Sequence, residues 1–314
     1  MNDFSPQLTC YRPSGIAPFG GVAATLVLGC ASGVLLGAVY AFLNHHDPLV
    51  YLNLVLTLFL AYLIGWILSK GVRKFQVRNT LVAAVMGASV FAVTYFVHWF
   101  VYLATVLVDF ETDSPYDIAT IADVVLVLVQ NPEDAWMLIQ EFNREGVWTL
   151  TSSSGTASDV IKGVPLTVIW IVEALILGYH AVKSPLEEAG KPYSERLGKW
   201  MEFKTLPTGI AFVENVENFK SAIARNDYSA LTTLFSEEAN IPPQDRKTRY
   251  RKYATVDLYP DPAEPYISVQ NVTVKIKKKK EEVSTKNVIR YLKISPTVAQ
   301  NIASALEPRV EESV

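Results

Sequence analysis

The sequence predicts an α-helical polytopic membrane bundle of four transmembrane helices, followed by a small cytoplasmic α+β domain. Four long apolar runs, 19–43, 49–69, 80–108 and 163–182, each reach or approach the roughly 20 residues that cross a bilayer. Charge is dense only after Lys183, although charged residues make up 19% of the whole chain. These two observations divide the chain into a cytoplasmic N-terminal segment (1–18), three transmembrane helices (19–108), an extracytoplasmic acidic helical segment (109–162), a fourth transmembrane helix (163–182) and the cytoplasmic domain (183–314).

The first apolar run carries small residues at every fourth position. Because a helix repeats every 3.6 residues, this spacing draws one ridge along which another backbone can approach closely. The run is longer than the 7–15 apolar residues of a signal peptide, so we expect a retained helix. The ridge favours tight packing inside a four-helix bundle, while self-association and a sliding interface remain alternatives. Its members are Gly21, Thr25, Gly29, Gly33, Gly37 and Ala41.

The second and third runs contain the first candidate polar residues. The short turn at 45–48 makes the first two helices an antiparallel hairpin, in which Asn53 and Thr57 can supply interhelical hydrogen bonds of roughly 0.6–2 kcal/mol each. In the third run, His98 stands among Tyr95, Trp99 and Tyr102. Aromatic residues gather at membrane interfaces, so this group predicts an interfacial belt more readily than a ligand site.

Glu173 is the most informative single residue. It lies about ten residues into the fourth run, which places it near the middle of a bilayer. A carboxyl group at that depth costs at least about 2.5 kcal/mol and normally faces the bundle interior. One interpretation is a neutral side chain that is hydrogen-bonded to Ser32, Thr57 or a backbone carbonyl and only stabilises helix packing. The other is a proton- or cation-responsive site.

The positive charges of the short loops predict the orientation. Lys70, Arg73, Lys74 and Arg78 cluster between the second and third runs, which marks that loop as cytoplasmic. The acidic segment 109–162 is then outside, and both termini are cytoplasmic. Within that segment, 117–129 and the residues after Asn131-Pro132 predict two helices, with Asn131 as N-cap and Gly146 as the stop. The Ser/Gly-rich stretch 151–156 predicts a flexible connection.

The cytoplasmic domain combines helical and strand patterns. We predict helices over 213–226, 228–235 and 297–306, and strands over 249–259, 266–278 and 283–294. Lysines at 275 and 277–280 mark the turn between the last two strands. No interleaved aromatic residues or second basic stripe accompany them, so a charged hairpin tip is expected and no nucleic acid partner.

The chemistry of enzymes is not visible in the chain. The two cysteines, Cys10 and Cys30, predict neither a disulfide framework nor a metal site, and no phosphate-binding loop or nucleophile elbow occurs. We therefore predict no catalytic residues, no metal and no cofactor, and that the protein is not an enzyme.

Three short motifs carry a resemblance. They are Tyr11-Arg12-Pro13-Ser14-Gly15, Val50-Tyr51-Leu52-Asn53 and Trp170-x-x-Glu173-Ala174. Over its membrane part the chain resembles uncharacterised bacterial four-span inner-membrane proteins whose relatives carry a cysteine-bearing, zinc-knuckle-like segment after the last span. Here Ser194 and Leu197 stand where a Cys-x-x-Cys pair would lie, so the resemblance implies a degenerate site without metal. It also implies the bacterial inner membrane.

Two functions follow as hypotheses. The first is a non-catalytic scaffold, accessory or sensor subunit, in contact with the lipid bilayer, whose cytoplasmic domain binds a protein partner or a second copy. The alternative is a small oligomeric transporter or channel that uses Glu173. The Glu173→Gln substitution distinguishes them, because transport should change whereas a scaffold should tolerate the neutral side chain.

Overall fold

The computed structural model describes residues 8–46, 50–111, 118–146, 148–151, 157–233, 248–277 and 280–306. The chain forms two compact units, one of residues 13–190 and one that combines residues 1–12 with 191–314. We had expected the second unit to begin at 183 and the N-terminal segment to stand apart. The division moves because helix α6 continues for two turns beyond the apolar run, as far as Ala189.

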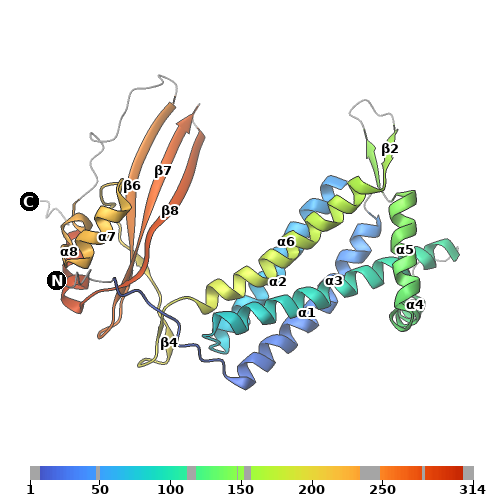
Figure 1. Ribbon diagram of the computed structural model, residues 1–314, viewed down its shortest axis with the longest axis horizontal. Helices are drawn as coiled ribbons and strands as arrows, with labels where there is room; N and C mark the ends of the chain where they lie inside the picture. Colours follow the sequence, from blue (N-terminus) through green and yellow to red (C-terminus); the bar gives the residue numbers. More distant parts are fainter. Residues whose placement is uncertain are drawn as a thin grey trace, which may run out of the picture. The chain divides into compact units, whose positions relative to one another are not determined.

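The first unit is a bundle of long helices (Figure 1). Four of them are long and apolar enough to cross a membrane. They are α1 (Phe19–His46), α2 (Val50–Lys74), α3 (Thr80–Glu111) and α6 (Val164–Ala189). Helices α1 and α6 each pack against both α2 and α3 and make little contact with each other in the described residues, so they lie diagonally across the bundle.

The small-residue ridge of α1 faces the inside of this bundle. All six of its residues are buried, together with Tyr40 and Asn44 of the same helix. A methyl group added at Gly37 would lie 2.7 Å from the backbone oxygen of Thr94 on α3. Helix α2 does the same toward α6, where a methyl group at Gly65 would lie 2.5 Å from Ser184 Oγ. Small residues therefore set the close approach of neighbouring backbones within the chain.

The end of the bundle at which α1 ends and α2 begins is called the distal end below. There a helical pair, α4 (Ile118–Gln130) and α5 (Pro132–Glu145), packs on the end of α3. Gly146 ends α5 as predicted, with φ of 91° and its N–H donated to Phe142 O. Asn131 stands at the N-cap position of α5 as predicted, but its side chain makes no capping hydrogen bond and its amide donates to Val127 O.

The residues after α5 form a hairpin that we did not predict. Strands β1 (Trp148–Thr151) and β2 (Ala157–Ile161) pair antiparallel and lead into α6. Most of the predicted flexible stretch, 152–156, lies outside the described residues. The strands are only four and five residues long, which is too short for a clear alternation of apolar and polar positions.

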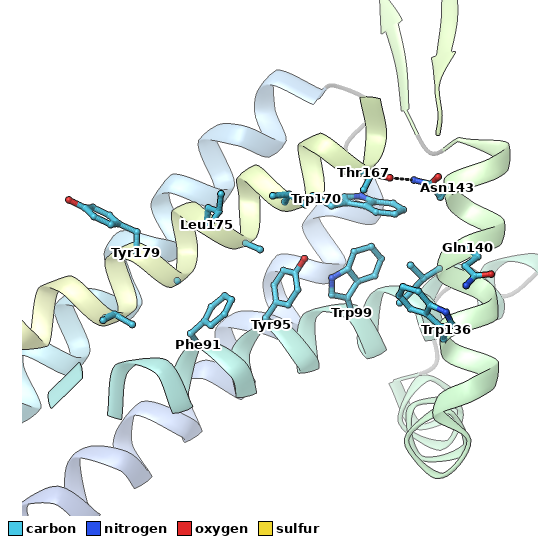
Figure 2. Close-up of a pocket in the computed structure, with 15 residues that line it drawn as sticks. Phe91, Tyr95, Trp99, Trp136, Gln140, Asn143, Thr167, Trp170, Leu175 and Tyr179 are labelled. Carbon is cyan, nitrogen blue, oxygen red and sulfur yellow. Dashed lines mark hydrogen bonds between the residues drawn. The ribbon is translucent and has the colours of Figure 1, made fainter. Parts of the chain in front are cut away.

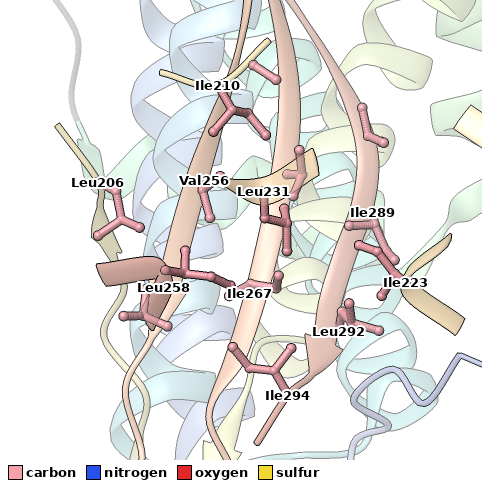
Figure 3. Close-up of a cluster of buried hydrophobic side chains, with 14 of the residues drawn as sticks. Leu206, Ile210, Ile223, Leu231, Val256, Leu258, Ile267, Ile289, Leu292 and Ile294 are labelled. Atoms are coloured by element: carbon pink, nitrogen blue, oxygen red, sulfur yellow. The ribbon is translucent and has the colours of Figure 1, made fainter. Parts of the chain in front are cut away.

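The second unit is built on a four-stranded antiparallel sheet of order β5-β6-β7-β8. Its strands are β5 (Lys204–Thr205), β6 (Thr248–Tyr259), β7 (Tyr266–Lys277) and β8 (Lys280–Lys293). Helices α7 (Val216–Ala224) and α8 (Pro296–Leu306) add Phe219, Ile223 and Ile302 to one apolar core with the sheet (Figure 3). The three long strands and α8 confirm the predicted pattern, because strict alternation and the Ser295-Pro296 start are strong local signals.

Two details of this unit correct the sequence analysis. In place of a helix over 228–235 the structure has a single 3-10 turn, Ser229–Leu231, and residues from 234 lie outside the described part. The helix predicted over 213–226 is shorter in the structure, where α7 spans Val216–Ala224.

The N-terminal segment completes the sheet. Tyr11 N donates to Tyr291 O at 2.8 Å, and Lys293 N donates to Thr9 O at 2.8 Å, so residues 9–11 run along the outer edge of β8. The Tyr11 ring packs edge-on against Tyr266, with ring centroids 5.5 Å apart. The segment before α1 and the domain after α6 therefore belong to one folded unit and lie on one side of any membrane that the helices cross.

Candidate functional site

A buried polar cluster lies inside the bundle and is built from all four long helices. It consists of Tyr40 on α1, Asn53 and Thr57 on α2, His98 on α3 and Glu173 on α6, each no more than 6% exposed. Sequence analysis named four of these residues, and the structure brings all four together. Tyr40 was missed, although it continues the buried face of the ridge three residues after Gly37.

The Asn53 carboxamide is the central group of the cluster. Its Nδ2 donates to Glu173 Oε1, and its Oδ1 accepts a hydrogen bond from the Tyr40 hydroxyl at 2.7 Å. The Tyr40 hydroxyl also lies 2.7 Å from Thr57 Oγ1, which in turn donates to Asn53 O. We had expected Glu173 to bond to Ser32, Thr57 or a backbone carbonyl; its partner is Asn53. One amide thus links α1 to α6 through α2.

His98 is buried against this cluster rather than standing in an interfacial belt. It is 4% exposed, and its ring centroid lies 4.6 Å from that of Tyr40. Within the described part of the chain, its Nδ1 is buried without a hydrogen-bond partner. The belt prediction failed for this residue because a histidine next to tyrosines on a helix can face inwards or outwards, and its neighbours in sequence do not decide which.

The depth of the cluster can be followed along three of the helices. Counting from Val164 places Glu173 about 14 Å along α6, near the middle of its apolar run. Asn53, however, lies in the first turn of α2, and Tyr40 lies about 9 Å before the end of α1. The cluster therefore lies closer to the distal end of α1 and α2 than to their middle.

A groove opens on the side of the same bundle, between α3, α5 and α6 (Figure 2). Its volume is about 980 Å³. Helix α3 lines it with Phe91, Tyr95 and Trp99, and the Trp99 and Trp170 rings meet edge to face at 4.9 Å. At the distal end, Asn143 Nδ2 donates to Thr167 Oγ1 at 2.8 Å and so joins α5 to α6. No sequence motif indicated this groove.

The groove and the polar cluster are neighbours. Tyr95 lines the groove and, with Tyr102, lies within electrostatic range of the Glu173 carboxylate. On α6, Glu173 itself faces inwards, whereas the next residue, Ala174, lines the groove. The groove and the buried carboxyl group therefore lie on different faces of α6.

The segment compared above with a zinc knuckle folds into a small hairpin of β3 (Tyr193–Ser194) and β4 (Lys199–Trp200). At its turn, Ser194 Oγ accepts from Leu197 N at 3.2 Å, and the Ser194 hydroxyl also bonds to Asp261. Asp261 Oδ1 accepts from the amides of Ala263 and Glu264 and lies 3.6 Å from Arg196. Among the described residues there is no group of three or more potential metal ligands.

The electrostatics of Asp261 follow from these contacts. Burial alone would raise the pKa of this carboxyl group, but the hydrogen bonds from Ala263, Ser194 and Glu264, with the Arg196 charge, hold it below its ordinary value. The ionised carboxylate thus holds two turns of the sheet unit together.

Comparison of the chain with protein-family models, curated proteins and solved structures gives no match, so the family resemblance stated above stays a prediction. What the molecule itself establishes is that the described residues contain four helices long and apolar enough to span a membrane, joined to a separate sheet unit.

Proposed function

We propose that this chain is a multi-pass membrane protein that acts as a non-catalytic accessory or sensor subunit, with the sheet unit as its protein-binding part. One observation carries the proposal: Asn53 ties α1 to α6, and these are the two helices through which the chain leaves and re-enters the sheet unit. A change at Glu173 or Tyr40 alters the restraint between α1 and α6. That change reaches the sheet unit along two covalent connections, at Pro13 and at Gly190.

The same proposal includes the location. The basic residues at the end of α2 and in the turn after it favour cytoplasmic termini, and the family resemblance favours the bacterial inner membrane. The sheet unit would then present its surface to a cytoplasmic protein.

The relay is tested by hydrogen exchange on the full-length protein in lipid nanodiscs. The probes are amides where residues 9–11 pair with β8, such as Tyr11 and Lys293. We expect Glu173→Leu, which removes the acceptor of the Asn53 bond, to speed their exchange. Glu173→Gln keeps an acceptor oxygen and should leave the rates near those of the parent protein. Equal exchange in all three proteins would contradict a relay.

The accessory role is tested by the mass of the complex purified in mild detergent. We expect a second protein at fixed stoichiometry. Recovery of the chain alone, or only with copies of itself, contradicts this role.

A transporter or channel is the second candidate, and the buried carboxyl group of Glu173 among polar groups from four helices favours it. Reconstituted vesicles that conduct ions or protons, and lose conduction in Glu173→Gln, would support this alternative.

A further inference from the structure

The groove between α3, α5 and α6 has the size of a ligand site. Its volume of about 980 Å³ lies at the upper end of the range for small-molecule pockets. Along α6 it extends from Thr167 to Val182, a rise of about 22 Å. A groove of this length can take an extended chain that lies along α6.

The chemistry of the groove changes along its length. Its polar side chains Gln140, Asn143 and Thr167 gather at the distal end, where α5 meets the start of α6 (Figure 2). The other end is lined by Phe91, Gly178 and Val182, together with Tyr179, whose hydroxyl accepts a hydrogen bond from Lys183 just outside the lining. Of the described residues that line the groove, none is charged. Such a surface suits a long apolar chain whose one end carries uncharged polar groups.

The side chains of the groove wall on α6 are exposed on the outside of the bundle, where lipid would surround a membrane-spanning helix. Ile171 and Leu175 on the α6 wall are 53% and 65% exposed, although both lie on a helix apolar enough to cross a membrane. Three tryptophans, Trp99, Trp136 and Trp170, lie toward the polar end. Tryptophan prefers the depth at which a bilayer changes from headgroups to hydrocarbon. The polar end of the groove therefore matches the ester level of one leaflet.

We propose that this groove binds one acyl chain of a membrane glycerophospholipid from the distal leaflet. The chain lies along α6 between Tyr95 and Leu175, and the glycerol ester meets Gln140 and the tryptophan N–H groups. Half of the roughly 30 Å hydrocarbon core is about 15 Å, so a groove of about 22 Å accommodates the whole chain of one leaflet. The inference goes beyond the proposed function and stands whether or not the protein relays a signal.

The test is photolabelling in phosphatidylcholine vesicles that contain a small fraction of phosphatidylcholine with a diazirine in its acyl chain. The labelled peptides of the full-length protein are mapped by mass spectrometry. We expect label to concentrate in 91–99 and 170–179. Uniform label on all lipid-facing surfaces overturns the proposal. Groove peptides that stay unlabelled while other surfaces are labelled overturn it as well, since they would show that a protein segment fills the groove.

Matched variants make the test specific. Ala174→Trp fills the groove, whereas Ala88→Trp places the same side chain on an exposed position of α3 outside it. Displacing two methylene groups of the bound chain is enough for about tenfold weaker binding, so Ala174→Trp should lower groove labelling by about that factor. Gly178→Leu, beside the Phe91 ring, should repeat the loss at the apolar end. Equal labelling of the Ala174 and Ala88 variants refutes a specific site.

Discussion

The Asn53 side chain makes two hydrogen bonds that an apolar residue of the same size cannot make. Asn53→Leu removes the donor to Glu173 and the acceptor from Tyr40, and it leaves both partners buried. We expect a loss of about 2 kcal/mol in the free energy of unfolding, from two interhelical bonds and an unsatisfied carboxyl group. Reversible unfolding in mixed detergent micelles, followed by circular dichroism, measures it.

Glu173→Gln is the control for this prediction because its amide oxygen can still accept from Asn53. It should cost clearly less than Asn53→Leu. If both variants have the same free energy of unfolding as the parent protein, the cluster does not stabilise the bundle.

Asp261 makes the stability of the sheet unit depend on pH in the acid range. Its pKa is lowered in the folded state, so its contribution is complete above the unfolded value of about 3.9 and is lost as pH falls through the lower folded value. Protection factors of the Ala263 and Glu264 amides should therefore fall below about pH 4. In Asp261→Asn they should be lower at neutral pH and change little on acidification. Parallel pH profiles for the two proteins would contradict the assignment.

Helix packing in the bundle depends on the ridge of α1. Gly37→Ala brings a methyl group to 2.7 Å from Thr94 O, so α1 and α3 must move apart, at a cost of about 1–3 kcal/mol. Gly20→Ala is the matched control, because nothing lies within 4 Å of a methyl group there. Thermal unfolding in detergent should show a lower midpoint for Gly37→Ala only. Equal midpoints would show that the close approach of α1 and α3 at Gly37 does not contribute to the stability of the bundle.

The elements that could be predicted are those with long, regular patterns. The four apolar helices and the three long strands repeat over ten or more residues, so one misplaced residue does not hide them. The β1–β2 hairpin and the turn at Ser229–Leu231 are short, and their conformation depends on what they pack against. Asn131 occupies the predicted N-cap position, but the hydrogen bond that its side chain makes, to Val127 O of the preceding helix, is not visible in a local pattern.

The candidate site was only partly predictable for a related reason. Glu173, Asn53 and Thr57 stand out as polar residues in apolar runs, and burial is the expected consequence in a membrane. Tyr40 and most of the groove residues are aromatic or aliphatic, so they look like ordinary membrane-facing positions. The groove arises from α3, α5 and α6 together, and no local pattern reports that combination.

For the whole molecule, the side of the membrane on which the sheet unit lies can be determined by labelling a cysteine that the chain already contains. Cys10 is exposed and belongs to the sheet unit, while Cys30 lies in α1. Partial burial raises the pKa of the Cys10 thiol, an effect that Lys220 opposes, so labelling needs mildly alkaline buffer. In Cys30→Ala, a membrane-impermeant maleimide should label Cys10 in inverted vesicles and not in intact cells. The reverse pattern would place the sheet unit outside.

The pairing of residues 9–11 with the edge of β8 has a consequence for biosynthesis. Tyr11 and Tyr291 are 280 positions apart, so the ribosome finishes nearly the whole chain before this edge can close. By then all four membrane helices have been inserted. If one helix is left out or inserted in reverse, residues 9–11 and strand β8 lie on opposite sides of the bilayer and cannot pair. Only molecules with all four helices correctly inserted can pair residues 9–11 with β8. In wrongly inserted molecules the edge of β8 would stay open and expose them to proteolysis.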